Sequence, residues 1–262
     1  MPSTAARNGA NVSPVTRPYI NLYPLPNTSD PANAQVGDWA NNDVQRINEH
    51  YFSGRVDHQL GSNHSLFGRY TFDNSTLMDP DQIPLFGSNA RIRNQYVTLE
   101  ERSILSPSTI NAVRLGFSRS AQFSDLYDIN PPAPNLSFVQ GRPMGGIATT
   151  GLTALGGYSG NAPRNYILNI FQIYDDFTWE RAAHSIKIGF AGEHFIFNRK
   201  GVSRLGGAWT FGNITSFLTN GTPTRLRIMG PDVFTDAKGR TLRTDPYRTA
   251  IQKLLSAYFQ DD

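Results

Sequence analysis

The sequence predicts an all-β fold: a segment of an antiparallel, up-and-down transmembrane β-barrel with about seven meander strands and long extracellular loops. Stretches of alternating apolar and polar residues occur in pairs, and short turns join the members of each pair at 61–63, 106–108 and 181–184. Long polar stretches follow the pairs, at roughly 74–94, 120–164 and 198–250. Compact soluble domains rarely carry loops beyond about 12–15 residues, whereas membrane β-barrels alternate short turns with long loops.

Composition excludes several other classes. The chain is 39% hydrophobic and contains no run of about 20 apolar residues, so a transmembrane helix is excluded. Its net charge is +3 and its Lys and Arg are scattered, which gives no support for nucleic-acid binding. The absence of cysteine excludes thiol catalysis and Cys-based zinc sites. No apolar segment follows Met1 to Arg7, so the pattern predicts no signal peptide.

The chain divides into an irregular leader, residues 1–48, and a partial barrel, residues 49–262. The leader is rich in Pro and Asn and shows no periodic pattern. If the first strand runs toward the short turn at 61–63, the leader lies on the side of the long loops. The chain would then begin within an extracellular loop.

The first strand pair shows the clearest alternation. Phe52, Val56 and Leu60 alternate with Arg55 and Asp57. The second strand places Leu66, Gly68, Tyr70 and Phe72 on one face and Phe67, Arg69, Thr71 and Asp73 on the other. Period-two alternation indicates strands with one apolar and one polar face. The expected length of about nine or ten residues matches a tilted membrane-spanning strand.

Later strands repeat the pattern with two exceptions. Val113, Leu115 and Phe117 lie on one face of their strand and Arg114 lies on the other. In the strand after residue 184, Ile186 and the apolar residues in phase with it lie on the face opposite to Lys187 and Glu193. Glu101 and Asp175, however, share a face with apolar neighbours. A charge on the lipid face of a barrel costs free energy, so we expect either a β-bulge or an interfacial position at both sites.

Two further segments need separate interpretation. Residues 141–160 are rich in Gly and small residues and lack the glycine spacing of a phosphate-binding motif, so we expect a mobile surface loop. The tail, residues 249–262, contains helix formers, but Tyr258 to Asp262 repeats the pattern of residues 173–177. We therefore favour a strand over a helix for the tail.

No pattern typical of an enzyme or a metal site occurs, and we expect no catalytic residues, cofactor or metal. The histidines lack ligand spacing; they are His50, His58, His64, His184 and His194. Adjacent acids such as Glu100 and Glu101 point to opposite faces of a strand and cannot converge as an acid–base pair. No GxSxG nucleophile motif is present.

Four stretches carry a family resemblance: FSGRVDHQLGSNHSLFGRYTFDNS (52–75), LEERSILSPSTINAVRLGFSRS (99–120), NIFQIYDDFTWERAAHSIKIGFAGEHF (169–195) and SAYFQDD (256–262). Together they resemble the barrel of TonB-dependent outer-membrane receptors, in particular the Oar-like group with a carboxypeptidase-regulatory-like domain. The resemblance covers most of residues 40–262. It implies a bacterial outer-membrane location and a barrel of about 22 strands closed by a plug. The chain would be an internal stretch of that barrel, without the plug or the TonB box.

The resemblance also implies partners and a mechanism. The partners would be outer-membrane lipid, the receptor's own plug and TonB system, and an unidentified extracellular ligand captured by the loops. The mechanism would be energised, plug-gated import of a bulky, scarce ligand without covalent chemistry. We expect seven charged residues to face the lumen, either contacting the plug or solvating a wet lumen: Arg55, Asp57, Arg69, Asp73, Arg114, Lys187 and Glu193.

Two other classes remain as alternatives. A secreted β-sandwich that binds glycans or mediates adhesion would show polar outer faces on at least half its strands, whereas every regular strand here has a full apolar face. A β-rich hydrolase would need convergent acids or a nucleophile motif, and neither is found. The sequence therefore favours the barrel.

Overall fold

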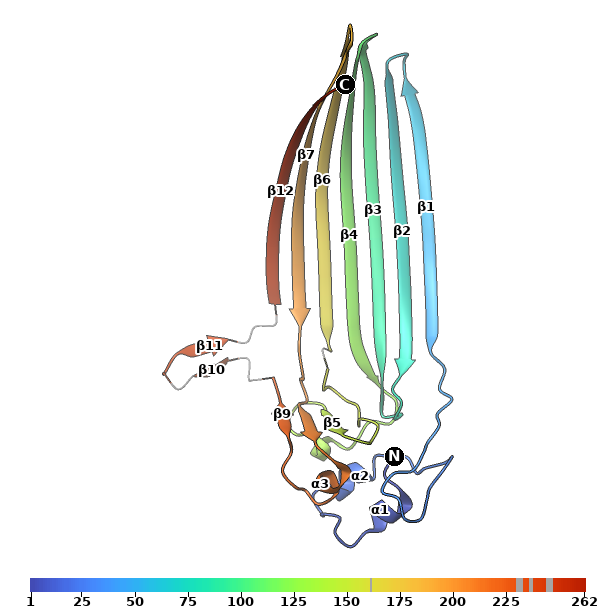
Figure 1. The fold of residues 1–262 in the computed structure, drawn as a ribbon, viewed down its shortest axis with the longest axis vertical. Helices are drawn as coiled ribbons and strands as arrows, with labels where there is room; N and C mark the ends of the chain where they lie inside the picture. Colours follow the sequence, from blue (N-terminus) through green and yellow to red (C-terminus); the bar gives the residue numbers. More distant parts are fainter. Residues whose placement is uncertain (161, 230–232, 236–237, 244–246) are drawn as a thin grey trace.

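The computed structural model describes residues 1–160, 162–229, 233–235, 238–243 and 247–262 (Figure 1). Its main element is an antiparallel sheet of seven strands, each hydrogen-bonded to the next long strand along the chain. In order they are β1 (Arg46–Leu60), β2 (His64–Pro80), β3 (Phe86–Ser106), β4 (Thr109–Asp128), β6 (Arg164–Arg181), β7 (His184–Gly201) and β12 (Tyr247–Asp261). The all-β, seven-stranded meander is confirmed, and so is the prediction that the tail forms a strand.

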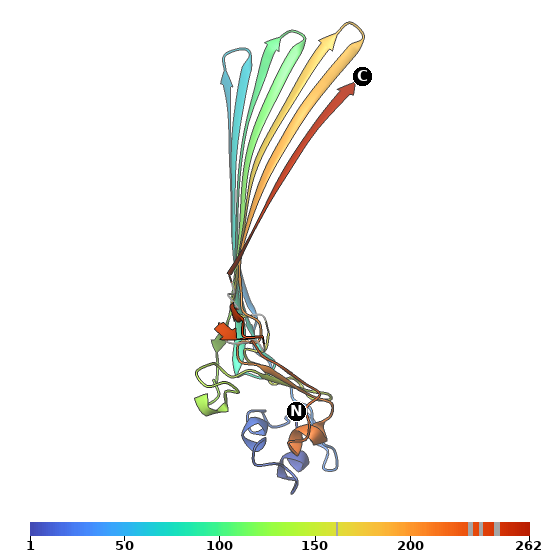
Figure 2. The same ribbon diagram turned by 90° about the vertical axis from the view of Figure 1, so that its left-hand side faces the viewer.

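The sheet is open and single-layered. Among the described strands, β1 pairs only with β2 and β12 only with β7, so the two edges do not meet. Figure 2 shows the strands fanning out at the turn end, with no second sheet against either face there. The β-sandwich alternative is therefore wrong, because a sandwich buries its apolar faces between two packed sheets.

Short turns and long connections lie at opposite ends of the sheet (Figure 1). The three predicted turns are confirmed, joining β1 to β2, β3 to β4 and β6 to β7. The predicted long loop at 74–94 is wrong, since β2 and β3 continue as a paired ladder to Pro80 and Phe86. Polar residues on both faces resemble a loop in sequence, yet the backbone hydrogen bonds continue through them. The predicted loop at 198–250 includes residues 230–232, 236–237 and 244–246, which lie outside the described part of the chain.

The strands are longer than the nine or ten residues expected. They contain 15 to 21 residues, and the alternation of the sequence analysis covers only the half next to the turns. One face of that half is apolar; we call it the lipid face, and it carries Val56, Leu99, Leu115, Ile173 and Ile188, all exposed. The opposite side, with Arg55, Glu100 and Arg114, is the luminal face. The apolar part alone has the length that crosses a membrane.

No bulge occurs at Glu101 or Asp175. Glu101 pairs in register with Val113, which pairs with Asp175, and the register of β3 and β4 shifts only between Ile104 and Ser106. Of the two expected explanations, the β-bulge is wrong, and the interfacial position stays a prediction. Glu101 accepts hydrogen bonds from Ser103 at 2.5 Å and contacts His64 Nδ1 at 2.9 Å. Asp175 has a buried Oδ1 without a hydrogen-bond partner among the described residues.

The connections at the loop end pack into a compact unit, which we call the cap: residues 1–45, 81–85, 129–160 and 202–229. It contains α1 (Thr4–Asn8), α2 (Arg17–Ile20), α3 (Ile214–Leu218), the 3₁₀ turn η1 (Pro134–Leu136), β5 (Gly146–Thr149), β8 (Ala208–Phe211) and β9 (Arg225–Arg227). A two-stranded sheet joins β10 (Val233–Thr235) to β11 (Thr241–Arg243). Most of the buried apolar residues lie in the cap rather than in the long sheet.

The glycine-rich segment 141–160 is part of this core. Met144, Ile147 and Leu155 are all buried, and β5 pairs in parallel with β8. A Cβ on Gly145 would lie 2.0 Å from the carbonyl oxygen of Gly207, so only glycine permits this close approach of two backbones. The expectation of a surface loop is wrong here, because its glycines serve packing.

The side chain of Arg7 links separate parts of the leader, residues 1–48, to one another. Its guanidinium donates to four carbonyl oxygens: Nε to Pro2 at 3.1 Å, Nη1 to Ile20 at 3.1 Å and Tyr23 at 3.0 Å, and Nη2 to Pro24 at 2.6 Å. Burial lowers the pKa of Arg7 from its ordinary value, opposed by Asp30. The leader is then tied to α3, since the Thr16 hydroxyl donates to the Leu218 carbonyl at 2.9 Å.

We expect Asp175→Val to raise the free energy of unfolding by about 1 kcal/mol, because an acid on the lipid face carries a modest cost that valine removes. Urea titration of the chain in lipid vesicles measures the change. Asp176→Asn is the matched control, since Asp176 lies on the luminal face and accepts a hydrogen bond from the Tyr258 hydroxyl at 3.0 Å. A loss of stability in Asp175→Val would contradict the assignment of this residue to the lipid face.

We expect Arg7→Met to open the leader, because four carbonyl oxygens lose a charged donor that methionine cannot replace. Losing hydrogen bonds of this kind costs about 2 kcal/mol or more, so amide hydrogen exchange in residues 1–24 should accelerate about 30-fold. Arg17→Met, which removes one bond to the Arg7 carbonyl at 3.0 Å, should have a much smaller effect. Equal exchange in both variants would show that Arg7 does not organise the leader.

Candidate functional site

The seven charged residues singled out by the sequence all lie on the luminal face. The register aligns them across β1, β2, β4 and β7: Arg55, Asp57, Arg69, Asp73, Arg114, Lys187 and Glu193. Alternation within each strand brings them to one face, and pairing between strands sets their neighbours. Five of them fall into three separate groups of contacts, and Arg69 and Asp73 lie outside these groups.

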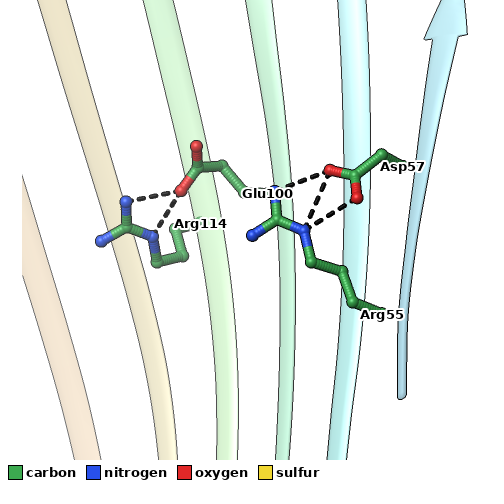
Figure 3. Close-up of polar contacts among 4 residues, drawn as sticks. All are labelled: Arg55, Asp57, Glu100 and Arg114. Atoms are coloured by element: carbon green, nitrogen blue, oxygen red, sulfur yellow. Dashed lines mark hydrogen bonds and ion pairs between the residues drawn. The ribbon is translucent and has the colours of Figure 1, made fainter.

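The first group links β1 and β2. Arg55 donates to Asp57 two positions along the same strand, with Nε 2.8 Å from Oδ2 and Nη2 2.6 Å from Oδ1 (Figure 3). The Arg55 guanidinium also lies 4.2 Å from the centre of the Phe67 ring. Both charged side chains are more than half exposed, so the pair orients the arginine more than it stabilises the sheet.

The second group joins β3 to β4. Arg114 Nε donates to Glu100 Oε2 at 2.6 Å from the directly opposite position of the next strand (Figure 3). Glu100 is only 19% exposed, so this carboxylate is more shielded than Asp57. In the sequence, Glu100 stands out only as half of a carboxylate pair with Glu101. The alternation of side chains along β3 is enough to predict that Glu100 faces the lumen. Its partner, Arg114, follows only from the register between β3 and β4.

The third group connects β6, β7 and β12. Glu193 Oε1 accepts from the Tyr174 hydroxyl at 2.6 Å and from Gln172 Nε2 at 2.7 Å. Lys187 Nζ lies 3.0 Å from Asp262 Oδ2. The sequence pattern does not point to Tyr174, Gln172 or Asp262, because these residues become recognisable as partners only once the strand register is known.

Arg69 and Asp73 have weaker contacts. Arg69 Nε donates to Ser53 Oγ at 3.4 Å, and Asp73 Oδ2 accepts from Asn94 Nδ2 at 3.3 Å. Asp73 Oδ1 is buried and has no hydrogen-bond partner in the described part of the chain. This oxygen is therefore shielded from the lumen although its acceptor capacity is unused.

The luminal face is a wall of mixed charge rather than a reaction centre. Three of its cations pair with carboxylates, and its other charged groups contact neutral side chains. Glu100 and Glu101 lie on opposite faces, as expected from strand geometry. Among the described residues, no group of three or more His, Cys, Asp or Glu side chains could hold a metal ion. None of the helices in that part of the chain is long and apolar enough to cross a membrane.

A second candidate site is a groove of about 520 Å³ in the cap. Tyr19, Phe138 and Trp209 form one wall, with ring centres 5.6 Å apart for the first pair and 6.4 Å for the second. Its polar lining comes from neutral side chains, among them Thr16 and Asn220. The volume falls in the range of small-molecule sites, and aromatic walls with a few neutral polar groups suit a ligand of mixed polarity.

Long strands, one apolar belt and a mixed-charge opposite face define the wall of a membrane-spanning β-barrel. The family comparison agrees: the Outer membrane beta barrel domain family matches residues 2–262, and the chain belongs to this family. The fold places it in the bacterial outer membrane.

Other comparisons are sparse. No curated protein matches the chain. Among solved structures, the outer membrane transporter YddB from Escherichia coli matches at 8% identity with a TM-score of 0.27. The match covers 82% of this chain and 34% of YddB, so the chain spans about a third of that transporter's length.

We expect Glu100→Gln and Arg114→Met to show a coupling of about 1 kcal/mol in a double-mutant cycle, because the pair is partly shielded and well aligned. Urea unfolding of the four proteins at low and high salt measures it, and the coupling should shrink at high salt. Ser53→Ala with Arg69→Met is the control cycle, and its 3.4 Å contact should give almost no coupling. Equal couplings in both cycles would contradict the pairing of Glu100 with Arg114.

Proposed function

We propose that this chain is part of the barrel wall of a TonB-dependent receptor that imports a bulky, scarce ligand by energised, plug-gated transport. The observation that carries the proposal is the luminal face itself. Its paired acids and bases present hydrogen-bonding groups over several strands, from Arg55 on β1 to Lys187 on β7. Such a surface needs polar contents, and a folded plug supplies them.

The open edges support a barrel wider than seven strands. A strand edge in a lipid bilayer leaves backbone N–H and C=O groups unpaired, which costs several kcal/mol per group. Residues of β1 and β12 are exposed along nearly their whole length, so both edges need further strands as partners. Wide barrels of this kind require an occluding element if the membrane is to remain sealed.

The cap supports capture of a ligand on the outer side. Short turns face the periplasm in outer-membrane barrels, so the cap at the opposite end faces the medium. Its aromatic groove beside Tyr19, Phe138 and Trp209 is open to solvent and uncharged in its lining. In this proposal the groove makes the first contact with the ligand, and plug-gated transport then takes the ligand through the charged lumen.

Site-specific photocrosslinking in the native outer membrane tests the plug. Tyr174 and Ile173 are adjacent residues of β6 on opposite faces, so benzoylphenylalanine at each forms a matched pair. We expect the probe at 174 to crosslink a polypeptide segment from within the barrel, with a yield that changes when TonB is removed. The probe at 173 should crosslink only lipid.

Conductance distinguishes the alternative of an open channel. If the probe at 174 yields no protein adduct and the purified protein conducts ions steadily in planar bilayers, the lumen is filled with water. That result would exclude plug-gated transport and leave a passive pore.

A further inference from the structure

The strand β9 (Arg225–Arg227) forms an open edge in the cap. It is the outer member of the three-stranded sheet β5–β8–β9, which lies just beyond the cap end of the long sheet (Figure 1). Among the described strands, β9 pairs only with β8. An edge strand directs the N–H and C=O groups of alternate residues away from its sheet, so these groups are free to pair with a further strand.

The two arginines of β9 lie on one face of this sheet. Arg225 pairs in register with Thr210, and Arg227 pairs with Ala208 two positions away. In the described part of the chain, neither guanidinium forms a hydrogen bond or an ion pair. Residues on one face of a strand repeat about every 6.6–6.8 Å. The edge therefore presents two unpaired positive charges at a fixed spacing.

A hollow of about 230 Å³ adjoins these arginines on the same face. Its lining includes Arg204 as a third cation, and no acid among the described residues contributes to it. Arg204 Nη1 donates to the hydroxyl of Ser203 at 2.7 Å, so its hydrogen-bond partner is neutral. The small side chains of Ala148 and Ala208 line the hollow as well and leave room for the side chains of a ligand.

The other face of the edge is apolar and open to solvent. Leu226 is 47% exposed, and Ile228, directly after β9, is 43% exposed. Neither side chain belongs to the buried core of the cap. Residues 225–228 thus alternate cationic and apolar side chains along an edge that has no strand beside it.

We propose that β9 docks an extended acidic peptide of a polypeptide partner, which adds to the cap sheet as a fourth strand. Strand addition of this kind takes its affinity from backbone hydrogen bonds and its specificity from alternate side chains. Acids at every second position of the peptide have the same repeat of about 6.6–6.8 Å as the two arginines, so each acid lies opposite one guanidinium. Apolar residues between the acids cover Leu226 and Ile228 on the other face.

A second copy of this chain does not suit the edge. Antiparallel pairing of two β9 strands centred on Leu226 places Arg225 of one copy opposite Arg227 of the other, and like charges directly opposite each other are destabilising. The partner therefore carries the opposite charge. Because the cap end faces the medium, it approaches from outside the cell. This inference needs only the cap sheet and is independent of the proposed transport.

Fluorescence anisotropy of labelled peptides, with the full chain in dodecyl maltoside micelles, tests the docking. The probe is the peptide Glu-Val-Glu-Val-Glu. One control is Glu-Glu-Glu-Val-Val, which has the same composition without the alternation, and the other is the probe N-methylated at every residue. We expect the probe to bind about tenfold more tightly than either control, because only the probe offers both the charge spacing and the backbone donors.

Each control has an outcome that overturns the proposal. Equal binding of the rearranged peptide would show general charge attraction without a register. Equal binding of the N-methylated peptide would place the ligand on the face of the sheet instead of at its edge. Absence of binding by all three peptides would leave the arginines as charges that keep an open edge from aggregating.

Substitution gives a second readout. The combined variant Arg225→Gln and Arg227→Gln should bind the probe about tenfold less tightly, since it loses two opposite-charge pairs across the added strand. The control variant Arg46→Gln and Arg181→Gln removes the same net charge at exposed positions of the long sheet and should bind the probe unchanged. Equal affinity of the two variants would overturn a site at β9.

Discussion

The backbone hydrogen-bond ladder is the constraint on which the rest of this structure depends. A bilayer offers no water to unpaired amides, so every strand that crosses it must be paired on both sides. The ladder runs without a break from β1 to β12, apart from one shift between Ile104 and Ser106. Because side chains alternate strictly along a paired strand, this unbroken register assigns every residue to one of two faces.

That register explains why an acid such as Glu101 is tolerated on the lipid face. Moving Glu101 to the luminal side would need a one-residue slip, and the slip would carry Val97 and Leu99 into the lumen and Glu100 into lipid. The fold accepts two acids on this face, Glu101 and Asp175, and satisfies Glu101 locally through His64 and Ser103. Retaining register is worth more than removing a single unfavourable side chain.

The sequence was sufficient for strand identity, face and turn position, because these depend on local alternation. Arg55 and Asp57 could be assigned to the polar face from their own strand. Their exact contacts could not, since the partner of Arg114 is Glu100 only in the observed register. The same limit hid Tyr174, whose neighbour Glu193 lies 19 residues away in the chain.

Strand ends were predicted poorly for a different reason. Beyond the apolar belt, both faces of the sheet contact water, so the alternation of apolar and polar residues no longer shows which side chains share a face. Polar strand segments, such as the half of β2 next to the cap, therefore resemble loops in sequence. The cap was missed for the opposite reason. Its core is assembled from segments distant in sequence, for example Ile20, Leu155 and Phe217, each too short to show a periodic pattern.

The polarity of the sheet reverses where it leaves the belt, and this reversal links cap, lumen and membrane. Beyond the row of Val97, β3 and β4 bring arginines to the lipid face (Arg119, Arg93 and Arg91), while the luminal face gains Ile92, Leu168 and Phe197. A strand that continues into water no longer needs an apolar outside, and Leu168 and Phe197 are half-buried on its luminal side. The outer half of the sheet is therefore built like the wall of a water-soluble protein, and the turn half like a membrane wall. The boundary between them falls at different rows in different strands, since Phe52 on β1, Phe72 on β2 and Ile196 on β7 continue the apolar face into the row of Arg119.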